Sequence, residues 1–285
     1  MMSSDGLAIA ALCAYAGLAA AVVAWQAWRC PAGPAIWWLY VAERIMCGLL
    51  WRVRPRSGDG SEGRCPFPTD SGALIVANHR SPVDPIVLWQ NHHLASSRRT
   101  IRPIGFLMAR EYYEQPSLNW FFKAMHAIPV TRAVQDTGAV RQAVHRLRAG
   151  ELVGIFPEGG LNTGPPGIKP ANPGVAFLAL NTDAPIYPVY IHAAPTGRSM
   201  LRAFFSPARV RLIYGEPISL AAYRGDNNRK NQELLREVTD VIMTAVANLG
   251  GVPYAGTVAE AEPRSSRRPQ ASHADANLNP LLNRS

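Results

Sequence analysis

Acidic residues are few in this sequence. Twenty aspartates and glutamates stand against 29 lysines and arginines, which gives a formal net charge of +9. A basic excess of this size favours negatively charged partners, either anionic lipid or nucleic acid. No recognisable nucleic-acid-binding module accompanies it, and five arginines but one acid lie between Arg29 and Arg56, directly after the most hydrophobic segment. The charge therefore predicts contact with a membrane and no nucleic-acid partner.

Cysteine is also scarce, and its four positions form no Cys-x2-Cys pair (Cys13, Cys30, Cys47 and Cys65). This spacing argues against a zinc site and against a disulfide framework, so we expect reduced thiols and no metal. The glycines of residues 58–63 match a dinucleotide-binding fingerprint, but no strand precedes them and prolines follow where a helix should begin. The sequence therefore predicts no redox cofactor.

Charge is missing altogether between Leu7 and Trp28. A helix over this segment is long enough to cross the hydrocarbon core of a bilayer. A cleaved signal peptide is the competing interpretation, but residues 1–6 contain one acid and no basic residue. Because the arginines follow the segment, the positive-inside rule predicts that the rest of the chain faces the cytoplasm.

A second apolar stretch, Ala35 to Trp51, is rich in aromatic residues but is interrupted by Glu43 and Arg44. It is too short and too charged to span a bilayer, so we expect an amphipathic helix at the membrane surface, with a helix packed on the core as the alternative. These features predict a membrane anchor over residues 1–56, followed by a glycine-rich linker over 57–69.

Polar residues follow the apolar run Ala73 to Ala77 in the segment Asn78-His79-Arg80-Ser81-Pro82-Val83-Asp84-Pro85. A neutral imidazole accepts a proton near pH 7, and a carboxylate on its other nitrogen fixes the tautomer. His79 and Asp84 are candidates for such a pair. Asp84-Pro85 is also typical of a helix N-terminus, with Asp84 as the cap and Pro85 at the first position.

Three further segments follow in order: Ile128 to Arg132 (IPVTR), Phe156 to Gly160 (FPEGG) and Pro185 to Val189 (PIYPV). Together with His79 to Asp84, they resemble the four blocks of the glycerolipid acyltransferase family, the PlsC-like 1-acylglycerol-3-phosphate acyltransferases. The resemblance covers roughly residues 70 to 215. It implies that His79 is the catalytic histidine, that Asp84 is its aspartate, and that Arg132 helps to hold a phosphate of the acceptor.

The third block matches the family only as far as Gly159. Glu158 and Gly159 carry over as substrate-binding residues, but Leu161 stands where the family has an arginine. Lys169 is a candidate to supply the missing charge, with a solvated loop lysine as the alternative. Arg80 is a candidate to bind phosphate, with a solvent-facing side chain as the alternative. The acceptor headgroup is therefore open.

Strand and helix patterns alternate through the rest of the chain. We expect strands at Leu74–Ala77, Arg102–Gly105, Ala127–Val130, Leu152–Phe156, Ile186–Ile191 and Val210–Tyr214. Apolar residues at helical spacing lie between Val140 and Leu147 and again between Leu234 and Leu249. This alternation predicts an α/β fold, with a mixed, mostly parallel sheet flanked by helices over residues 70–252. Residues 253–285 lack periodicity, and we expect a disordered tail.

The function predicted from the resemblance is transfer of a fatty acyl chain to the free hydroxyl of a lysophospholipid at the membrane. The donor would be acyl-CoA or acyl-carrier protein, and the acceptor would be 1-acylglycerol-3-phosphate. The lack of a Gly-x-Ser-x-Gly elbow agrees with direct transfer. Three alternatives are a different lysolipid acceptor such as a lyso-aminolipid, a thioesterase or lipid hydrolase that uses water, and a non-catalytic membrane protein.

Overall fold

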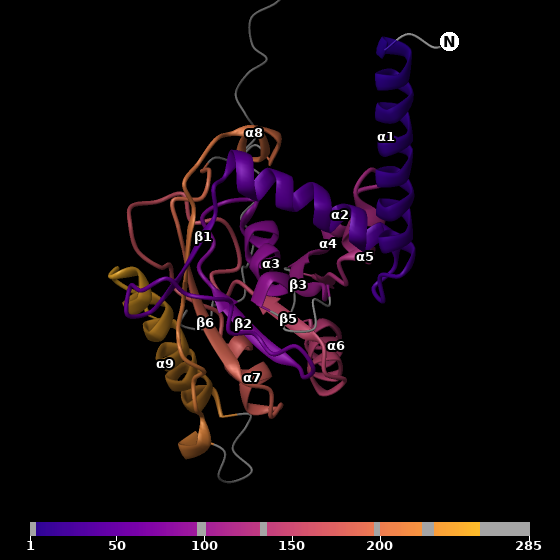
Figure 1. Cartoon of the computed structure of the whole chain (residues 1–285). Coiled ribbons are helices and arrows are strands. Elements are labelled where there is room, and N and C mark those ends of the chain that lie inside the picture. The colour runs from indigo at the N-terminus through magenta and orange to yellow at the C-terminus, as the bar shows by residue number, and fades with distance from the viewer. Residues whose placement is uncertain (1–3, 96–100, 132–135, 197–199, 224–230, 257–285) are drawn as a thin grey trace, which may run out of the picture.

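The structure, a computed structural model, describes residues 4–95, 101–131, 136–196, 200–223 and 231–256. Within these residues, seven strands form one sheet in the order β1-β7-β6-β2-β5-β3-β4 (Figure 1). The strands are β1 (Arg54–Ser57), β2 (Ala73–Ala77), β3 (Ile104–Ala109), β4 (Ile128–Val130), β5 (Leu152–Ile155), β6 (Ile186–His192) and β7 (Arg211–Tyr214).

All neighbouring strands pair in parallel except β6 and β7. The predicted mixed, mostly parallel sheet is therefore confirmed. The carboxyl ends of β2, β5 and β6 lie at one edge, which is where α/β enzymes place their sites. Since β7 is antiparallel to β6, its amino end and that of β1 lie at this same edge.

Helices cover both faces of the sheet (Figure 1). In chain order the helical segments are α1 (Ser4–Trp28), α2 (Pro34–Ile45), η1 (Met46–Leu50), α3 (Asp84–Ala95), α4 (Arg110–Tyr113), α5 (Asn119–Ala124), α6 (Thr137–Arg148), α7 (Gly174–Leu180), α8 (Met200–Phe205), η2 (Ala221–Tyr223) and α9 (Gln232–Gly250). The two helices expected from apolar spacing are thus present as α6 and α9. Asn231 caps α9 by accepting a hydrogen bond from the Glu233 backbone N–H, and α9 ends at Gly251, whose φ of 60° is left-handed.

The pleat of β2 divides the core in two. Ala73 and Ile75 belong to the core that packs against α2 and α3. Leu74 and Val76 belong to the core beneath α6, α7 and α9. Because successive side chains of a strand point to opposite faces, all of β2 is buried, which explains its continuous apolar sequence.

The two N-terminal helices differ in their packing. Of the described helices, α1 alone is long and apolar enough to cross a membrane, and most of its side chains are exposed. It stands away from the sheet in Figure 1. In contrast, α2 buries Ile36, Tyr40 and Glu43 against the domain, while Trp38 and Ile45 stay exposed. The core packing given as the alternative is therefore found, and the position of this helix at the membrane surface stays a prediction.

Two strands differ from the sequence prediction. β1 was not expected, and it pairs with β7, so the predicted boundary between anchor and linker at residues 56 and 57 falls inside a strand of the sheet. β3 spans Ile104–Ala109, whereas residues 102–105 were expected, and the Arg102 guanidinium just before it bonds the backbone oxygens of Pro68, Ser71 and Gly150. Residues 253–256, which were expected to belong to the disordered tail, hydrogen-bond instead to the backbones of Ile168 and Ala171. The division into domains otherwise stays a prediction, and residues 257–285 lie outside the described part.

Candidate active site

His79 and Asp84 meet directly after β2. His79 Nδ1 lies 3.0 Å from Asp84 Oδ2, and the Asp84 side chain is fully buried while that of His79 is 18% exposed. Since an ionised carboxylate only accepts hydrogen bonds, this contact places the ring proton on Nδ1. Nε2 then carries the lone pair, which is the arrangement a general base needs.

Asp84 is fixed by more than the histidine. Its Oδ2 also accepts the backbone N–H groups of Arg80 and Ser81, each at 2.8 Å. The predicted role as helix cap is therefore wrong by one residue: the carbonyl of Val83 accepts the first helical N–H groups, and Asp84 is the first residue of α3. The carboxylate reaches back into the turn rather than forward into the helix, and so it holds both the turn and the imidazole.

The backbone of His79 is bound from both sides by the loop that follows β5. Its N–H donates to Glu158 Oε1 at 2.7 Å, and its carbonyl accepts from the Asn162 N–H at 2.6 Å. One residue earlier, the Asn78 side chain exchanges two hydrogen bonds with the backbone of Ile191 in β6. The turn after β2 is thus attached to both of its neighbouring strands.

The imidazole of His79 rests on aromatic rings. It stacks on Phe156 with ring centroids 4.2 Å apart and an interplanar angle of 14°, and Phe156 stacks in turn on Phe106 at 5.2 Å and 7°. A Cβ at position 154 would collide with the Phe106 ring, so Gly154 in β5 makes room for it. The stack restrains the His79 ring through its face, whereas the Asp84 carboxylate holds the ring at its edge, at Nδ1.

Glu158 connects the turn to the loop beyond it. It is buried, and its second oxygen accepts the Lys169 backbone N–H at 3.0 Å. Burial raises the pKa of Glu158, and the hydrogen bonds from the backbones of Lys169 and His79 partly offset that rise. Since each oxygen accepts a backbone N–H, Glu158 holds the turn and the loop together, and its contact with a substrate stays a prediction.

Gly159 makes the turn that follows Glu158. Its φ is 68°, a left-handed conformation that suits glycine, and a Cβ there would lie 2.9 Å from the side-chain nitrogen of Asn172. Gly159 itself is exposed at the surface of the loop.

Two cations lie on the loop that carries Leu161. The ammonium of Lys169 donates to the carbonyl of Leu161 at 2.5 Å, and the Arg80 guanidinium donates to the carbonyls of Gly164 and Pro165. The structure thus brings Lys169 to the residue that replaces the family arginine, and the side chain of Arg80 reaches the same loop from the turn after β2. Both cations bond the loop backbone here.

Arg132 lies outside the described residues. Its neighbour Thr131 follows β4, and the Thr131 N–H donates to Asp136 Oδ2 at 2.9 Å. Hydrogen bonds from Ala139 and Thr131 lower the pKa of Asp136 to about 2, and the same carboxylate caps α6. The placement of Arg132 as a phosphate-binding residue stays a prediction.

Comparison with known proteins agrees with this geometry. Residues 61–192 match the family model described as Acyltransferase. This match identifies an acyltransferase-family domain within the chain. It is 28% identical over 189 residues to a 1-acyl-sn-glycerol-3-phosphate acyltransferase of Bacillus subtilis (strain 168), a match that covers 64% of this chain and 83% of the relative. The resemblance predicted from the sequence is confirmed.

A solved structure shares the fold of this chain. The crystal structure of the 1-acyl-sn-glycerophosphate (LPA) acyltransferase PlsC from Thermotoga maritima aligns with a TM-score of 0.55 and 22% identity. The alignment covers 82% of this chain and 89% of that one. At this level of identity the likeness concerns the fold.

Several residues of the site were not predicted from the sequence. Asn78, Asn162 and the stacked phenylalanines are common residue types with no motif spacing of their own, and their roles come from neighbours far along the chain. Gly154 gave a weak signal, because a glycine inside a buried strand often marks the close approach of another group. The fourth block, in contrast, lies in β6 directly beside β2.

Proposed function

We propose that this acyltransferase moves a fatty acyl chain from a thioester donor to the free hydroxyl of a lysophospholipid, with 1-acylglycerol-3-phosphate as acceptor and phosphatidic acid as product. The observation that carries the proposal is the contact between His79 and Asp84 at the carboxyl edge of β2, inside the segment that matches the family. The name of the Bacillus relative supports the choice of acceptor and a place in phospholipid biosynthesis.

The chemistry follows from the tautomer of His79. Nε2 takes the proton of the acceptor hydroxyl as the oxygen attacks the thioester carbonyl, and Asp84 stabilises the imidazolium that forms. The tetrahedral intermediate then expels the thiolate, which takes the proton from the imidazolium. The acyl group passes directly to the acceptor, so the enzyme needs no covalent intermediate, and the thioester supplies the driving force. Either acyl-CoA or acyl-carrier protein can supply such a thioester.

The acceptor would be held by its phosphate. Arg132, Lys169 and Arg80 are the cations that we assign to it, since Leu161 offers no charge. The ammonium of Lys169 already lies on the Leu161 carbonyl, which supports its role as the substitute for the missing arginine. Leu161 also favours a second candidate, a lysolipid with a different headgroup, because an apolar residue at this position removes one of the two expected phosphate contacts.

Attachment to the membrane would come from α1. We place the domain on the cytoplasmic side because the arginines follow α1, and cytoplasmic flanks carry the excess of Lys and Arg. Trp25 lies near the end of this helix, and the Arg29 guanidinium lies 4.8 Å from the centre of its ring. Such a pair suits the interface between the acyl chains and the headgroups.

The test is an assay of the purified full-length protein in detergent micelles with each thioester donor and a panel of lysolipids. We expect acylated lysophosphatidic acid, detected by mass spectrometry, and its loss in His79→Ala. The matched control is His145→Ala, which changes an exposed histidine of α6. Release of free fatty acid without acylated lipid would contradict the proposal and favour a hydrolase, and a stronger reaction with a lyso-aminolipid would favour the second candidate.

A further inference from the structure

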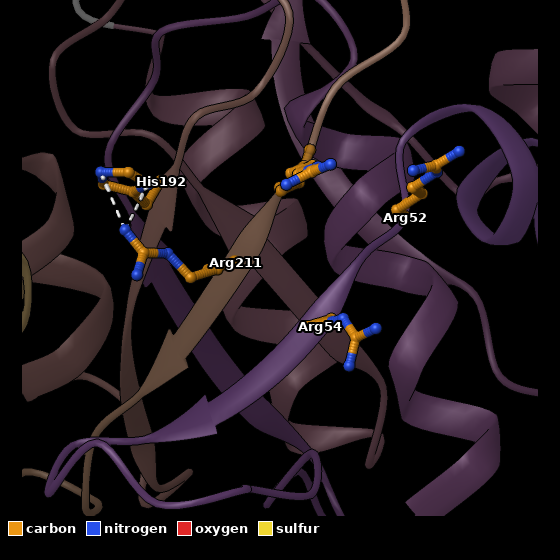
Figure 2. A pocket seen from close by; sticks show the side chains of 6 residues that line it. Arg52, Arg54, His192 and Arg211 are labelled. Carbon is orange, nitrogen blue, oxygen red and sulfur yellow. Dashed lines mark hydrogen bonds between the residues drawn. The ribbon is translucent and has the colours of Figure 1, made fainter.

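A cavity of about 570 Å³ opens beside β1 and β7 (Figure 2). Six residues line it, and we call them the arginine pocket: Arg52, Arg54, His192, Arg209, Val210 and Arg211. Its volume is within the range of small-ligand sites. Arg52 and Arg54 were considered above only as part of the basic run that follows α1, and the other four residues were assigned no role.

Strand register gathers these cations. Arg54 of β1 lies opposite Arg211 of β7, and Arg211 lies opposite His192 of β6. Arg211 also donates to the ring of His192, with 3.1 Å between Nη2 and Nδ1. Burial, and then the charge of Arg211, lower the pKa of His192, which keeps the ring neutral and able to accept this hydrogen bond.

Acidic partners are missing from the pocket. Among the described residues, no carboxylate lies within ion-pair distance of Arg52, Arg54, Arg209 or Arg211, and all four side chains are exposed. Four exposed guanidinium groups around one pocket give it a positive potential that favours a bound anion.

Within the pocket, His192 lies on the other face of the sheet from Phe156, while Val210 belongs to the same core as Phe156. Ile191 belongs to the core beneath α2 and α3, as does Phe156, on which His79 stacks. His192 is the next residue of β6, so strand alternation turns it toward the opposite face. The ring of His192 therefore does not face the Phe156 ring on which His79 stacks.

Exposed apolar residues precede the arginines on both segments. Leu49 in η1 is 76% exposed and comes shortly before Arg52 and Arg54. Leu201 and Phe205 in α8 are 73% and 66% exposed and come shortly before Arg209 and Arg211.

The two segments lie side by side at the top of Figure 1, beside the end of α2. Backbone hydrogen bonds join them, from Ala208 to Leu50 and from Val210 to Trp51, each at 3.0 Å. The rings of Trp51 and Phe204 also meet edge to face at 5.5 Å. Apolar tips next to arginines are typical of a surface that enters a bilayer as far as the phosphates.

We propose that the arginine pocket binds the phosphate headgroup of an anionic phospholipid of the bilayer, while Leu49, Leu201 and Phe205 enter the acyl layer beside it. Guanidinium groups suit this ligand because they pair with phosphate through two hydrogen bonds. The pocket would then give the catalytic domain a second attachment besides α1 and set the orientation of the sheet edge relative to the membrane. This proposal does not depend on the identity of the acyl acceptor.

The test uses the full-length protein in micelles of an uncharged detergent. Binding of dioctanoyl phosphatidylglycerol and of dioctanoyl phosphatidylcholine is measured by calorimetry for the wild type and for Arg209→Gln/Arg211→Gln. A control with the same change in charge is Arg64→Gln/Arg141→Gln, at exposed positions outside the pocket. Circular dichroism and the acyl-transfer rate in the same micelles report whether each variant is folded.

We expect the wild type and the control to bind the anionic lipid more tightly than the zwitterionic lipid. In the pocket variant the ratio of the two affinities should fall by roughly 10- to 30-fold, since each basic residue near anionic lipid adds a modest favourable energy. The acyl-transfer rate in uncharged micelles should be unchanged. An undiminished preference in the folded pocket variant would overturn the proposal. If that variant misfolds, Arg52→Gln/Arg54→Gln tests the other half of the pocket in the same way.

Adenosine 3′,5′-bisphosphate tests the other source of phosphate, the nucleotide end of an acyl-CoA donor. We expect weak binding that the pocket variant does not change. If this nucleotide binds more tightly than the anionic lipid, and Arg209→Gln/Arg211→Gln removes that binding, the pocket serves a nucleotide and the lipid proposal is wrong.

Discussion

The turn around His79 and the loop that follows Glu158 differ in how their polar groups are used. In the turn, the Nδ1 of His79, its backbone N–H and its carbonyl all have protein partners. In the loop, residues 163–166 are exposed, and its carbonyls accept bonds from Lys169 and Arg80. Glu158 joins the two regions, with one oxygen on each. The comparison indicates that catalysis rests on residues of the turn and the choice of acceptor on residues of the loop. Each property can then be changed by mutation without changing the other.

The largest effect should come from the turn. His79→Ala removes the proton acceptor, and we expect the acyl-transfer rate to fall by roughly 10²- to 10⁴-fold, the usual contribution of a general base. Binding of the acceptor should be unchanged because the loop cations remain. Single-turnover kinetics and acceptor binding, compared with His145→Ala, measure both quantities. If acceptor binding fell together with the acyl-transfer rate in His79→Ala, catalysis and acceptor binding would not rest on separate regions.

Replacing Glu158, which connects the turn and the loop, should affect both regions, but the loss of activity should be smaller than in His79→Ala. In Glu158→Gln the amide has one accepting oxygen for two backbone N–H groups, and an unsatisfied buried N–H costs about 1–3 kcal/mol. We expect kcat to fall about tenfold or more and the melting temperature to drop. Glu151→Gln, which changes a carboxylate at the opposite end of β5, is the control. Wild-type kcat in Glu158→Gln would show that the turn keeps its geometry without this link.

Lys169 distinguishes a phosphate contact from a structural contact. If its ammonium binds the acceptor, Lys169→Met should raise the KM for lysophosphatidic acid severalfold and leave the KM for lysophosphatidylcholine unchanged. If the ammonium only holds the Leu161 carbonyl, both values should rise together. Lys123→Met, on α5, controls for the lost charge. Equal increases for both lipids would contradict the role that we assign to Lys169.

A gain of activity should come from restoring the family residue. Leu161→Arg adds a charged donor, and we expect kcat/KM for lysophosphatidic acid to improve about tenfold relative to that for lysophosphatidylcholine, the value of one hydrogen bond to a charged group. Leu161→Gln adds a donor without charge and should change the ratio little. An unchanged ratio in Leu161→Arg would place the acceptor phosphate away from this loop.

The sequence predicted the parts of the site that have their own local signal. His79 and Asp84 are five residues apart, and their contact needs only the turn between them. The parallel strands were predicted because buried strands such as β2 are continuous apolar runs. The helices α6 and α9 were predicted because their apolar residues recur at helical spacing.

The parts that were missed depend on the fold. β1 has the sequence Arg-Pro-Arg-Ser, which no strand pattern predicts, and it exists because it lies at the sheet edge, where one side needs no partner and a proline is tolerated. The stack of His79 on Phe156 and the arginine pocket join residues that lie far apart in the chain. Side-chain contacts of this kind have no pattern in the sequence until the strand order is known.

The central claim is that His79 and Asp84 act as one unit, and a double-mutant cycle on the acyl-transfer rate tests it most directly. Asp84→Asn alone should be severe, because the amide favours the wrong ring tautomer and removes the charge that stabilises the imidazolium. Once His79→Ala has removed the imidazole, Asp84→Asn should cost almost nothing further, as is found for residues that share one catalytic step. If the two losses instead multiply in the double variant, Asp84 does not act through His79, and the account is contradicted.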